Sequence, residues 1–467
     1  MACLPLDAQT AKDVTYTLLD GSQLLDDCLI CGRPTLIYSL RGTFTLTPLD
    51  NNMLFARYRL TNIAFKAGPT ADMTYDISGT GVYRIGGEVA LVQGMTLDLK
   101  LNDRFLVFTN NQSSLDRQFP LIDISVAQTQ VNLAQFFSIH LVAAPVREIW
   151  FSTASGFTSA FHDLRGSPGD LLSATGRIVT SSSNLVAQLG LAPGVDPRGI
   201  DALDLGPGAE IFFSFDQNQN SATLGLIHHG DLVSNQGRIV QSNQMLTSAF
   251  GIMPSAPEVG LDAVTVKDDG EVLFSIRTDV FSERLGQTLQ KGDVLSDRGR
   301  IVRRNAELLS RFHPNGQKDY GLDALYVWPH GEIWFSTEED FQDLELGPIL
   351  AGDLLSDQGV IVFHNLELLS AFAPLEDLAD FGLDGLFVIT DLAPPAPPPI
   401  WTQIQRWLPD RTMALRWTGS GRVFRVDKAA DIAGPYLPCS PLLPGLMFDD
   451  LGAGTNADQS FYRLRQW

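Results

Sequence analysis

Four aspartates at a fixed spacing are the residues of this chain whose type and pattern could do chemistry. They are Asp201, Asp262, Asp323 and Asp384, and each lies 61 residues after the one before it. If the fold brings them together, the carboxylates must be hydrogen-bonded, share protons or hold a cation. Hard oxygen ligands would suit calcium, so a metal site at these four residues is one hypothesis. The pattern favours the structural alternative, in which each aspartate bonds the backbone of a neighbouring turn.

The cysteines favour a disulfide over a metal site. Cys28 and Cys31 form a C-x-x-C within DCLICG, but the first histidine is His140, too far along to complete an obvious zinc motif. A thioredoxin-like motif would need a following helix, whereas RPTLIYSLRGTFTLT has the pattern of a strand. In an oxidising compartment we expect a disulfide between Cys28 and Cys31, or from Cys3 to either of them.

Other motifs give no catalytic centre. The sequence contains no G-x-S-x-G, H-E-x-x-H or P-loop pattern, so we assign no catalytic and no cofactor-binding residue. The pair His228-His229 fits a surface loop. The tryptophans Trp150, Trp328 and Trp334 occupy strand positions, which favours a core role over a platform that stacks on sugars.

The charge of the chain narrows the class of partner. Its formal net charge is −21, and residues 141–399 carry 35 acidic against 15 basic side chains. Such a surface repels phosphate backbones and anionic lipid, so we expect no nucleic-acid partner. No apolar run is long enough for a transmembrane helix, so membrane insertion is not expected, and no signal peptide is visible at the start. Turn-rich β modules nevertheless favour an extracellular or cell-surface location.

A repeat of about 61 residues organises residues 141–392. The segments Gly260–Phe312 and Gly321–Phe372 are clear copies, and each reads as strand, glycine turn, strand, variable loop, strand, D-x-G turn and strand. Four antiparallel strands repeated in this way predict the blade of a β-propeller, here with four blades. The stretch GLDALYVWPHGEIWFS resembles the first hairpin of NHL-type propeller repeats and of uncharacterised secreted bacterial repeat proteins. The resemblance implies an architecture and no activity.

Counting strands suggests how the repeats would close. The segment LDGLFVIT matches the first strand of a repeat, but no second, third or fourth strand follows it. Conversely, the second to fourth strands that begin at Glu148 are preceded only by FSIHLVAAPVR, which matches a first strand loosely. Pairing these two sets would close a ring without a free edge. The alternative is an open β-rich solenoid.

Two all-β modules flank the repeats. Residues 1–140 alternate apolar and polar residues between short turns, which predicts an antiparallel sandwich or barrel. A proline-rich linker at residues 393–400 leads to residues 401–467. There RVFRVDKAADIAGPY and SFYRLRQW resemble a small fibronectin type III-like β-sandwich.

These patterns favour a non-catalytic extracellular or cell-surface protein that binds a protein or glycan surface, or assembles with itself, through a propeller. The first alternative is a hydrolase or lyase that acts on polysaccharide at one mouth of the propeller. The second is a structural protomer of a surface layer or filament. Calcium in the propeller channel is the one cofactor that the sequence suggests.

Overall fold

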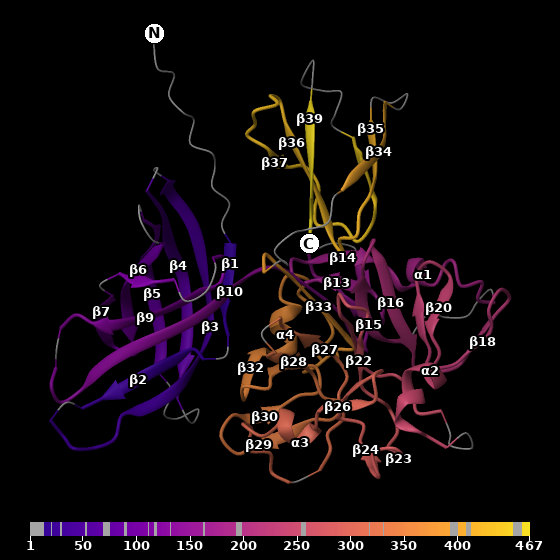
Figure 1. Cartoon of the computed structure of the whole chain (residues 1–467), viewed down its shortest axis with the longest axis horizontal. Coiled ribbons are helices and arrows are strands. Elements are labelled where there is room, and N and C mark those ends of the chain that lie inside the picture. Colours follow the sequence, from indigo (N-terminus) through magenta and orange to yellow (C-terminus); the bar gives the residue numbers. More distant parts are fainter. Residues whose placement is uncertain are drawn as a thin grey trace. The chain divides into compact units, whose positions relative to one another are not determined.

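The protein is all-β (Figure 1). A computed structural model describes residues 14–19, 21–28, 30–51, 54–68, 75–87, 91–110, 112–115, 119–130, 132–161, 164–192, 199–253, 258–316, 318–329, 331–392, 400–407, 412–451 and 460–467. Within these ranges the α-helices have only four or five residues, and none could cross a membrane. The prediction of an all-β chain is confirmed.

The chain divides into two compact units. The first is Met1–Arg147 with Glu345–Gly347 and Thr390–Leu392, and the second is Glu148–Leu344, Pro348–Ile389 and Ala393–Trp467. The repeats and the C-terminal module therefore share the second unit. The predicted linker at 393–400 lies outside the described residues except for its last position.

The first unit is one antiparallel sheet whose hydrogen-bonded path returns to its start. Strand β1 pairs with both β3 and β10, and the path between those two runs through β4, β5, β6, β7 and β9. The strands are β1 (Val14–Leu18), β2 (Gln23–Asp27), β3 (Leu36–Asn51), β4 (Phe55–Ala67), β5 (Tyr75–Gly86), β6 (Val92–Leu101), β7 (Arg104–Thr109), β8 (Ser113–Ser114), β9 (Ile122–Gln128) and β10 (Phe136–Ser152).

Alternating side chains explain the core of this unit. In β6, Met95, Leu97, Leu99 and Leu101 are buried, while the polar residues between them are exposed. Successive side chains of a strand point to opposite faces, so this alternation places one face of the sheet in the core. The same face carries Tyr83, whose hydroxyl lies 3.2 Å from Gln93 Oε1.

Each repeat in the second unit forms a four-stranded antiparallel sheet with the strand order predicted from the sequence. Three sheets are continuous in the chain. They are β15 (Ile200–Gly206), β16 (Glu210–Phe215), β19 (Leu232–Ser234) and β20 (Arg238–Gln241); β21 (Val264–Val266), β22 (Val272–Phe274), β25 (Val294–Ser296) and β26 (Arg300–Arg303); and β27 (Leu325–Val327), β28 (Ile333–Phe335), β31 (Leu354–Ser356) and β32 (Val360–Phe363).

The fourth sheet combines the two ends of the repeat region. Strand β33 (Gly385–Thr390) pairs with β10, which continues to β13 (Leu171–Ser173) and β14 (Arg177–Thr180). The segment LDGLFVIT, which contains β33, is therefore paired with the strands that begin at Glu148, as the strand count predicted.

The variable loop after the second strand is more regular than expected, because it forms a two-stranded hairpin in every repeat. These hairpins are β11 (Phe157–Thr158) with β12 (Arg165–Gly166), β17 (Gln219–Ser221) with β18 (Gly225–Ile227), β23 (Val280–Ser282) with β24 (Gln287–Leu289), and β29 (Phe341–Asp343) with β30 (Gly347–Ile349). The crossing segment after the fourth strand begins with a short helix: α1 (Ser182–Leu185), α2 (Asn243–Thr247, followed by a 3-10 turn at Ser248–Phe250), α3 (Asn305–Leu308) or α4 (Asn365–Leu368).

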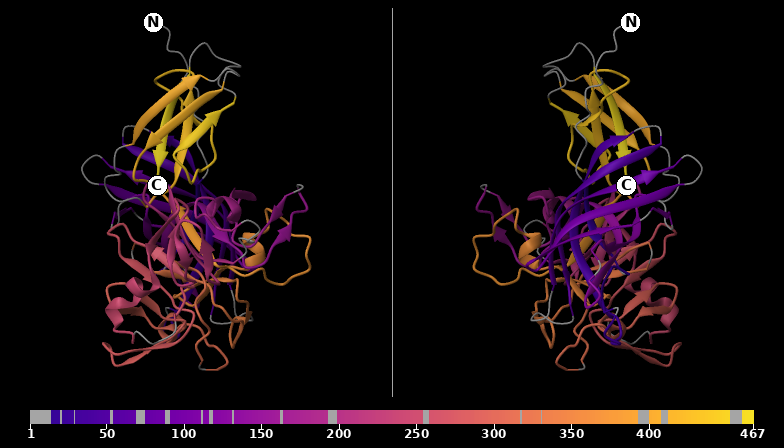
Figure 2. Two further views of the ribbon diagram at one scale, coloured as in Figure 1. Left: turned by 90° about the vertical axis from the view of Figure 1, so that its right-hand side faces the viewer. Right: turned by 90° about the vertical axis from the view of Figure 1, so that its left-hand side faces the viewer.

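Hydrogen bonds join each crossing segment to the hairpin of the next repeat. The last crossing segment bonds the first hairpin, since Ser159 Oγ donates to the carbonyl of Phe372 at 2.6 Å. Figure 2 shows this hairpin, in magenta, beside α4, in orange. The other three bonds run from Ser221 to Leu189 O, from Ser282 to Phe250 O and from His313 N to Asp343. The repeats thus contact one another in cyclic order.

A Gly-Asp pair precedes the third strand of every repeat, and its aspartate, which is Asp170, Asp231, Asp293 or Asp353, has a structural role. In every repeat its two carboxylate oxygens accept hydrogen bonds from two backbone N–H groups, one just before it and one at the start of the helix. The donors are Ser167 and Ser182 for Asp170, His228 and Asn243 for Asp231, Gln290 and Asn305 for Asp293, and Leu350 and Asn365 for Asp353.

The C-terminal module contains two three-stranded sheets, shown in yellow in Figure 2. One consists of β34 (Trp401–Trp407), β35 (Met413–Thr418) and β38 (Met447–Asp450), and the other of β36 (Phe424–Ala429), β37 (Leu437–Pro438) and β39 (Phe461–Gln466). Its Arg422 donates to the carbonyls of Leu205 at 2.5 Å and Val266 at 2.7 Å, at the ends of two repeat strands. The module is therefore anchored to the repeats by backbone carbonyls.

The role of the Gly-Asp pair can be tested at Asp353, which is 1% exposed. Asp353→Ala should lower the free energy of unfolding by about 1–3 kcal/mol, because the partly buried N–H of Leu350 and the buried N–H of Asn365 lose their acceptor. Chemical denaturation measures the change. Asp377→Ala, at an exposed position, is the matched control and should change stability by less than about 0.5 kcal/mol. Equal effects of the two substitutions would contradict this role.

Candidate functional site

The four spaced aspartates lie around one cavity. Its volume is about 910 Å³, and Asp201, Asp262, Asp323 and Asp384 all line it. Each comes from the segment that begins the first strand of its repeat. Asp201, Asp262 and Asp384 are 6%, 1% and 8% exposed, and Asp323 is partly buried. The structure therefore brings together every residue that the sequence proposed for a metal site. We call them the aspartate layer.

Some oxygens of the aspartate layer have no hydrogen bond. Asp201 Oδ2 and both carboxylate oxygens of Asp262 are buried without a hydrogen-bond partner. The structural alternative, in which each aspartate bonds a neighbouring turn, is therefore wrong for Asp262. Buried carboxylate oxygens without donors are unfavourable, and in native structures they point to a special role for the site.

A second layer of the cavity wall is formed by the residues two positions after the serine that ends the second-strand segment of each repeat, which is Ser152, Ser214, Ser275 or Ser336. Here the four repeats differ, with Ala154, Asp216, Arg277 and Glu338. Sequence reasoning missed these residues, although three of them share the 61-residue spacing. We call this set the variable layer.

Glycines hold the two layers in register. The residue two positions before each aspartate is a glycine with positive φ, which favours glycine over other residues. A Cβ built there would lie 2.1–2.6 Å from the side chain of the variable layer: Gly199 meets Asp216, Gly260 meets Arg277, Gly321 meets Glu338, and Gly382 meets Ala154.

One cation reaches the aspartate layer. Arg277 Nε lies 3.3 Å from Asp262 Oδ1, and Arg277 Nη1 lies 3.5 Å from Asp201 Oδ2. Among the described residues, no basic side chain lies within ion-pair distance of Asp323 or Asp384. The charge of the cavity is therefore compensated on one side.

Glu338 of the variable layer is paired outside the aspartate layer. It contacts Lys291 Nζ at 2.5 Å, and the same ammonium group contacts Glu339 at 3.0 Å. This carboxylate is therefore less free to bind a ligand than the aspartates are.

Burial and mutual repulsion shift the aspartates in one direction. Burial raises the pKa of Asp201, Asp262 and Asp323 well above the ordinary value, and neighbouring carboxylates raise it further. Burial raises the pKa of Asp384 to about 7, although Arg277 lowers it. Burial alone would lower the pKa of Arg277, but Asp201 and Asp262 outweigh burial and raise it.

The predicted calcium site has no preformed ligand set. Among the described residues, no group of three or more histidine, cysteine or acidic side chains is arranged to hold a metal ion. The aspartates share a cavity, but calcium usually takes six to eight oxygens at short distances. Calcium binding by Asp201, Asp262, Asp323 and Asp384 stays a prediction.

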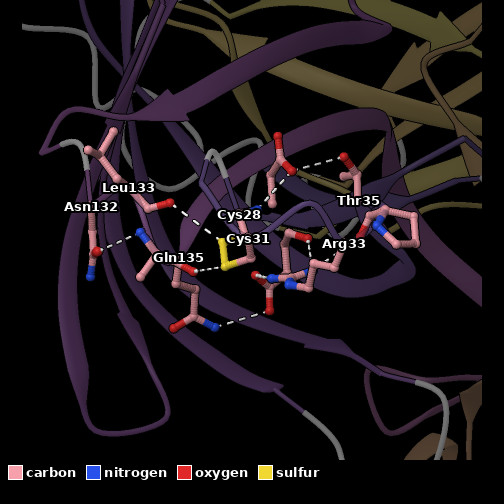
Figure 3. Close-up of a disulfide and its surroundings, with 11 residues drawn as sticks. Cys28, Cys31, Arg33, Thr35, Asn132, Leu133 and Gln135 are labelled. Carbon is pink, nitrogen blue, oxygen red and sulfur yellow. Dashed lines mark hydrogen bonds and ion pairs between the residues drawn. A yellow bond between two sulfur atoms is a disulfide. The ribbon is translucent and has the colours of Figure 1, made fainter.

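The remaining sequence candidates lie elsewhere. Cys28 and Cys31 form a disulfide, and their sulfurs lie 3.6 and 3.8 Å from the carbonyl oxygens of Leu133 and Ala134 (Figure 3). Cys3 lies outside the described residues. The disulfide is therefore local and links β2 to the segment that follows it.

The three tryptophans are core residues. Trp150, Trp328 and Trp334 are at most 1% exposed. They cannot form an exposed platform that stacks on sugars.

No known family model matches this chain, and no curated protein does. The resemblances to NHL-type repeats and to fibronectin type III-like modules stay predictions.

The raised pKa of Asp384 predicts the direction in which stability changes with pH. Because its folded-state pKa is raised, its protonation stabilises the fold at low pH, and this contribution is lost as pH rises from about 4 to about 7. Asp384→Asn removes the charge, so at pH 8 it should be more stable than wild type by at most about 4 kcal/mol. The gain should disappear near pH 4.

Denaturation at both pH values measures this difference, with Asp377→Asn as the exposed control. If Asp384→Asn were less stable than wild type by the same amount at both pH values, ionisation of Asp384 would not destabilise the fold.

Proposed function

We propose that this chain is a non-catalytic binding protein, in which the four repeat sheets form a four-bladed β-propeller and the acidic cavity receives a positively charged ligand. The ligand is a small cation or a basic segment of a partner protein. One observation carries the proposal: six carboxylates line the cavity, Asp201, Asp216, Asp262, Asp323, Glu338 and Asp384, against one guanidinium group.

The cyclic contacts between repeats support the propeller. Crossing segments bond the hairpins of the next repeat at all four junctions, including Ser159 with Phe372. The pairing of β33 with β10 leaves the first and last repeats in one sheet. Both features fit a closed ring better than an open solenoid, because a solenoid would leave the terminal repeats apart.

The electrostatics of the cavity favours binding over catalysis. An acid–base pair of carboxyl groups works when different surroundings separate the two pKa values. Here the pKa values of all four aspartates rise for the same first reason, burial. Among the described residues, the cavity lining includes no histidine, cysteine, serine or lysine, so carboxylates are the one type of nucleophile that it offers.

The nature of the cavity favours a cation over a glycan. Sugar sites commonly offer exposed aromatic faces, and no aromatic side chain is among the described residues that line this cavity. A cation would compensate the charge that Arg277 leaves unpaired, and its affinity would rise as the aspartates ionise.

We further propose an extracellular or cell-surface location. The disulfide between Cys28 and Cys31 supports it, because disulfides persist in oxidising compartments. The acidic surface favours a soluble partner over nucleic acid or a membrane surface.

Thermal unfolding of the full chain tests the proposed function. Calcium, spermidine and an arginine derivative are compared with neutral and acidic oligosaccharides at pH 8 and low salt. At least one cation should raise the melting temperature saturably, by about 2 °C or more at a large excess over its dissociation constant. The shift should shrink at pH 5, because the carboxyl group of Asp384, whose pKa burial raises to about 7, is then protonated.

The matched variants are Asp323→Asn in the cavity and Asp377→Asn on the surface. The first should reduce the shift and the second should not. Stabilisation by oligosaccharides alone would overturn the proposal in favour of a glycan ligand, and turnover of a polysaccharide would overturn it in favour of the enzyme.

A further inference from the structure

The variable layer is incomplete at one position of the cavity. Asp216, Arg277 and Glu338 extend charged side chains from three repeats, whereas the fourth repeat has Ala154. Ala154 is exposed, so there is room above its methyl group.

Arg277 shows what a cation does at this position. Its guanidinium lies between the aspartate of its own repeat, Asp262, and that of the preceding repeat, Asp201, at 3.3 and 3.5 Å. Its Nη1 also donates to the backbone carbonyl of Asp216 at 2.9 Å. One planar guanidinium thus forms ion pairs with two carboxylates, as its several N–H groups allow.

Ala154 has the same backbone setting as Arg277. A Cβ built on Gly382 would lie 2.6 Å from the Cβ of Ala154, and one on Gly260 would lie 2.6 Å from the Cβ of Arg277. The aspartates are anchored alike, since Asp384 N lies 3.3 Å from Ser152 O and Asp262 N lies 3.4 Å from Ser275 O. A guanidinium above Ala154 would therefore meet Asp384 and the preceding Asp323.

The cavity has two further marks of a binding site. Both carboxylate oxygens of Asp262, which is 1% exposed, line it without a hydrogen bond. The wall also includes the uncharged Pro168 and Gly199. A cation arriving there meets no basic side chain of the described wall other than Arg277.

We propose that the place above Ala154 receives the guanidinium group of a ligand, an arginine-type side chain, which pairs with Asp384 and Asp323 as Arg277 pairs with Asp262 and Asp201. This inference rests on the proposed function and names the class and the position of its ligand. A guanidinium fits better than an ammonium because its planar fork can serve two carboxylates at once.

Calorimetric titration of the full chain with N-acetyl-arginine amide tests the ligand class, with the citrulline analogue as its uncharged isostere. The arginine compound should bind at pH 8, and the citrulline compound should bind at least about tenfold more weakly. Equal affinities would overturn the inference.

Side-chain exchange tests the position. Ala154→Arg supplies the guanidinium from the chain itself, so it should weaken binding at least about tenfold and raise the melting temperature. Ala154→Met adds bulk without charge and should not raise it. The double variant Ala154→Arg with Arg277→Met moves the open place to the opposite pair, Asp262 and Asp201, and should regain the binding that Ala154→Arg loses.

The outcomes separate this inference from the proposed function. Unchanged binding by folded Ala154→Arg, or no recovery in the folded double variant, overturns the inference. So does a wild-type protein that binds calcium or spermidine but not N-acetyl-arginine amide, and in that case the proposed function stands. A wild-type protein that binds none of the three cations overturns both.

Discussion

Repulsion among buried carboxylates is the physical constraint that the repeat region has to satisfy. A repeat places the same residue at the same point of every copy, and cyclic contact brings those points around one cavity. Asp201, Asp262, Asp323 and Asp384 therefore cannot avoid one another. Burial raises their pKa values, so the fold must share protons among them, accept Arg277 or bind a cation from outside.

The repeated carboxylates differ in how their charge is satisfied, and this difference separates structure from function. The Gly-Asp aspartates accept two backbone hydrogen bonds each, as Asp353 does from Leu350 and Asn365. Burial opposes ionisation of Glu271, but hydrogen bonds from Ser296, Lys267 and Arg300 lower its pKa to about 2. Asp262, equally buried, has no hydrogen bond on either oxygen. The Gly-Asp rule is met in all four repeats, whereas buried oxygens of Asp201 and Asp262 lack hydrogen bonds, so the cavity rather than the Gly-Asp pairs is the candidate functional site.

The sequence predicted the parts of this structure that follow from period and turn chemistry. Fixed spacing identified the repeats, the strand order within each and the pairing of LDGLFVIT with the strand from Glu148. The hairpins after the second strand were not predicted, because their sequences differ and their pairing depends on contacts such as that of Ser221 with Leu189. The aspartate layer was found because its residue type is constant. The variable layer was missed because Arg277 and Ala154 become comparable only when the fold aligns them on Gly260 and Gly382.

The repeat that has alanine in the variable layer is also the repeat whose strands come from two distant segments of the chain. Ser159 and Phe372, which join across this repeat, are 213 residues apart in the chain. Here too Ser152 Oγ has no hydrogen-bond partner, whereas its counterparts Ser214, Ser275 and Ser336 donate to a carbonyl of the following repeat. A repeat assembled from two ends can lose one side chain of the variable layer without disturbing the others, because its strands still pair through the backbone. Among the described residues, Asp323 and Asp384 have no basic side chain within ion-pair distance, so the proposed ligand position lies in the repeat that combines the two ends of the repeat region.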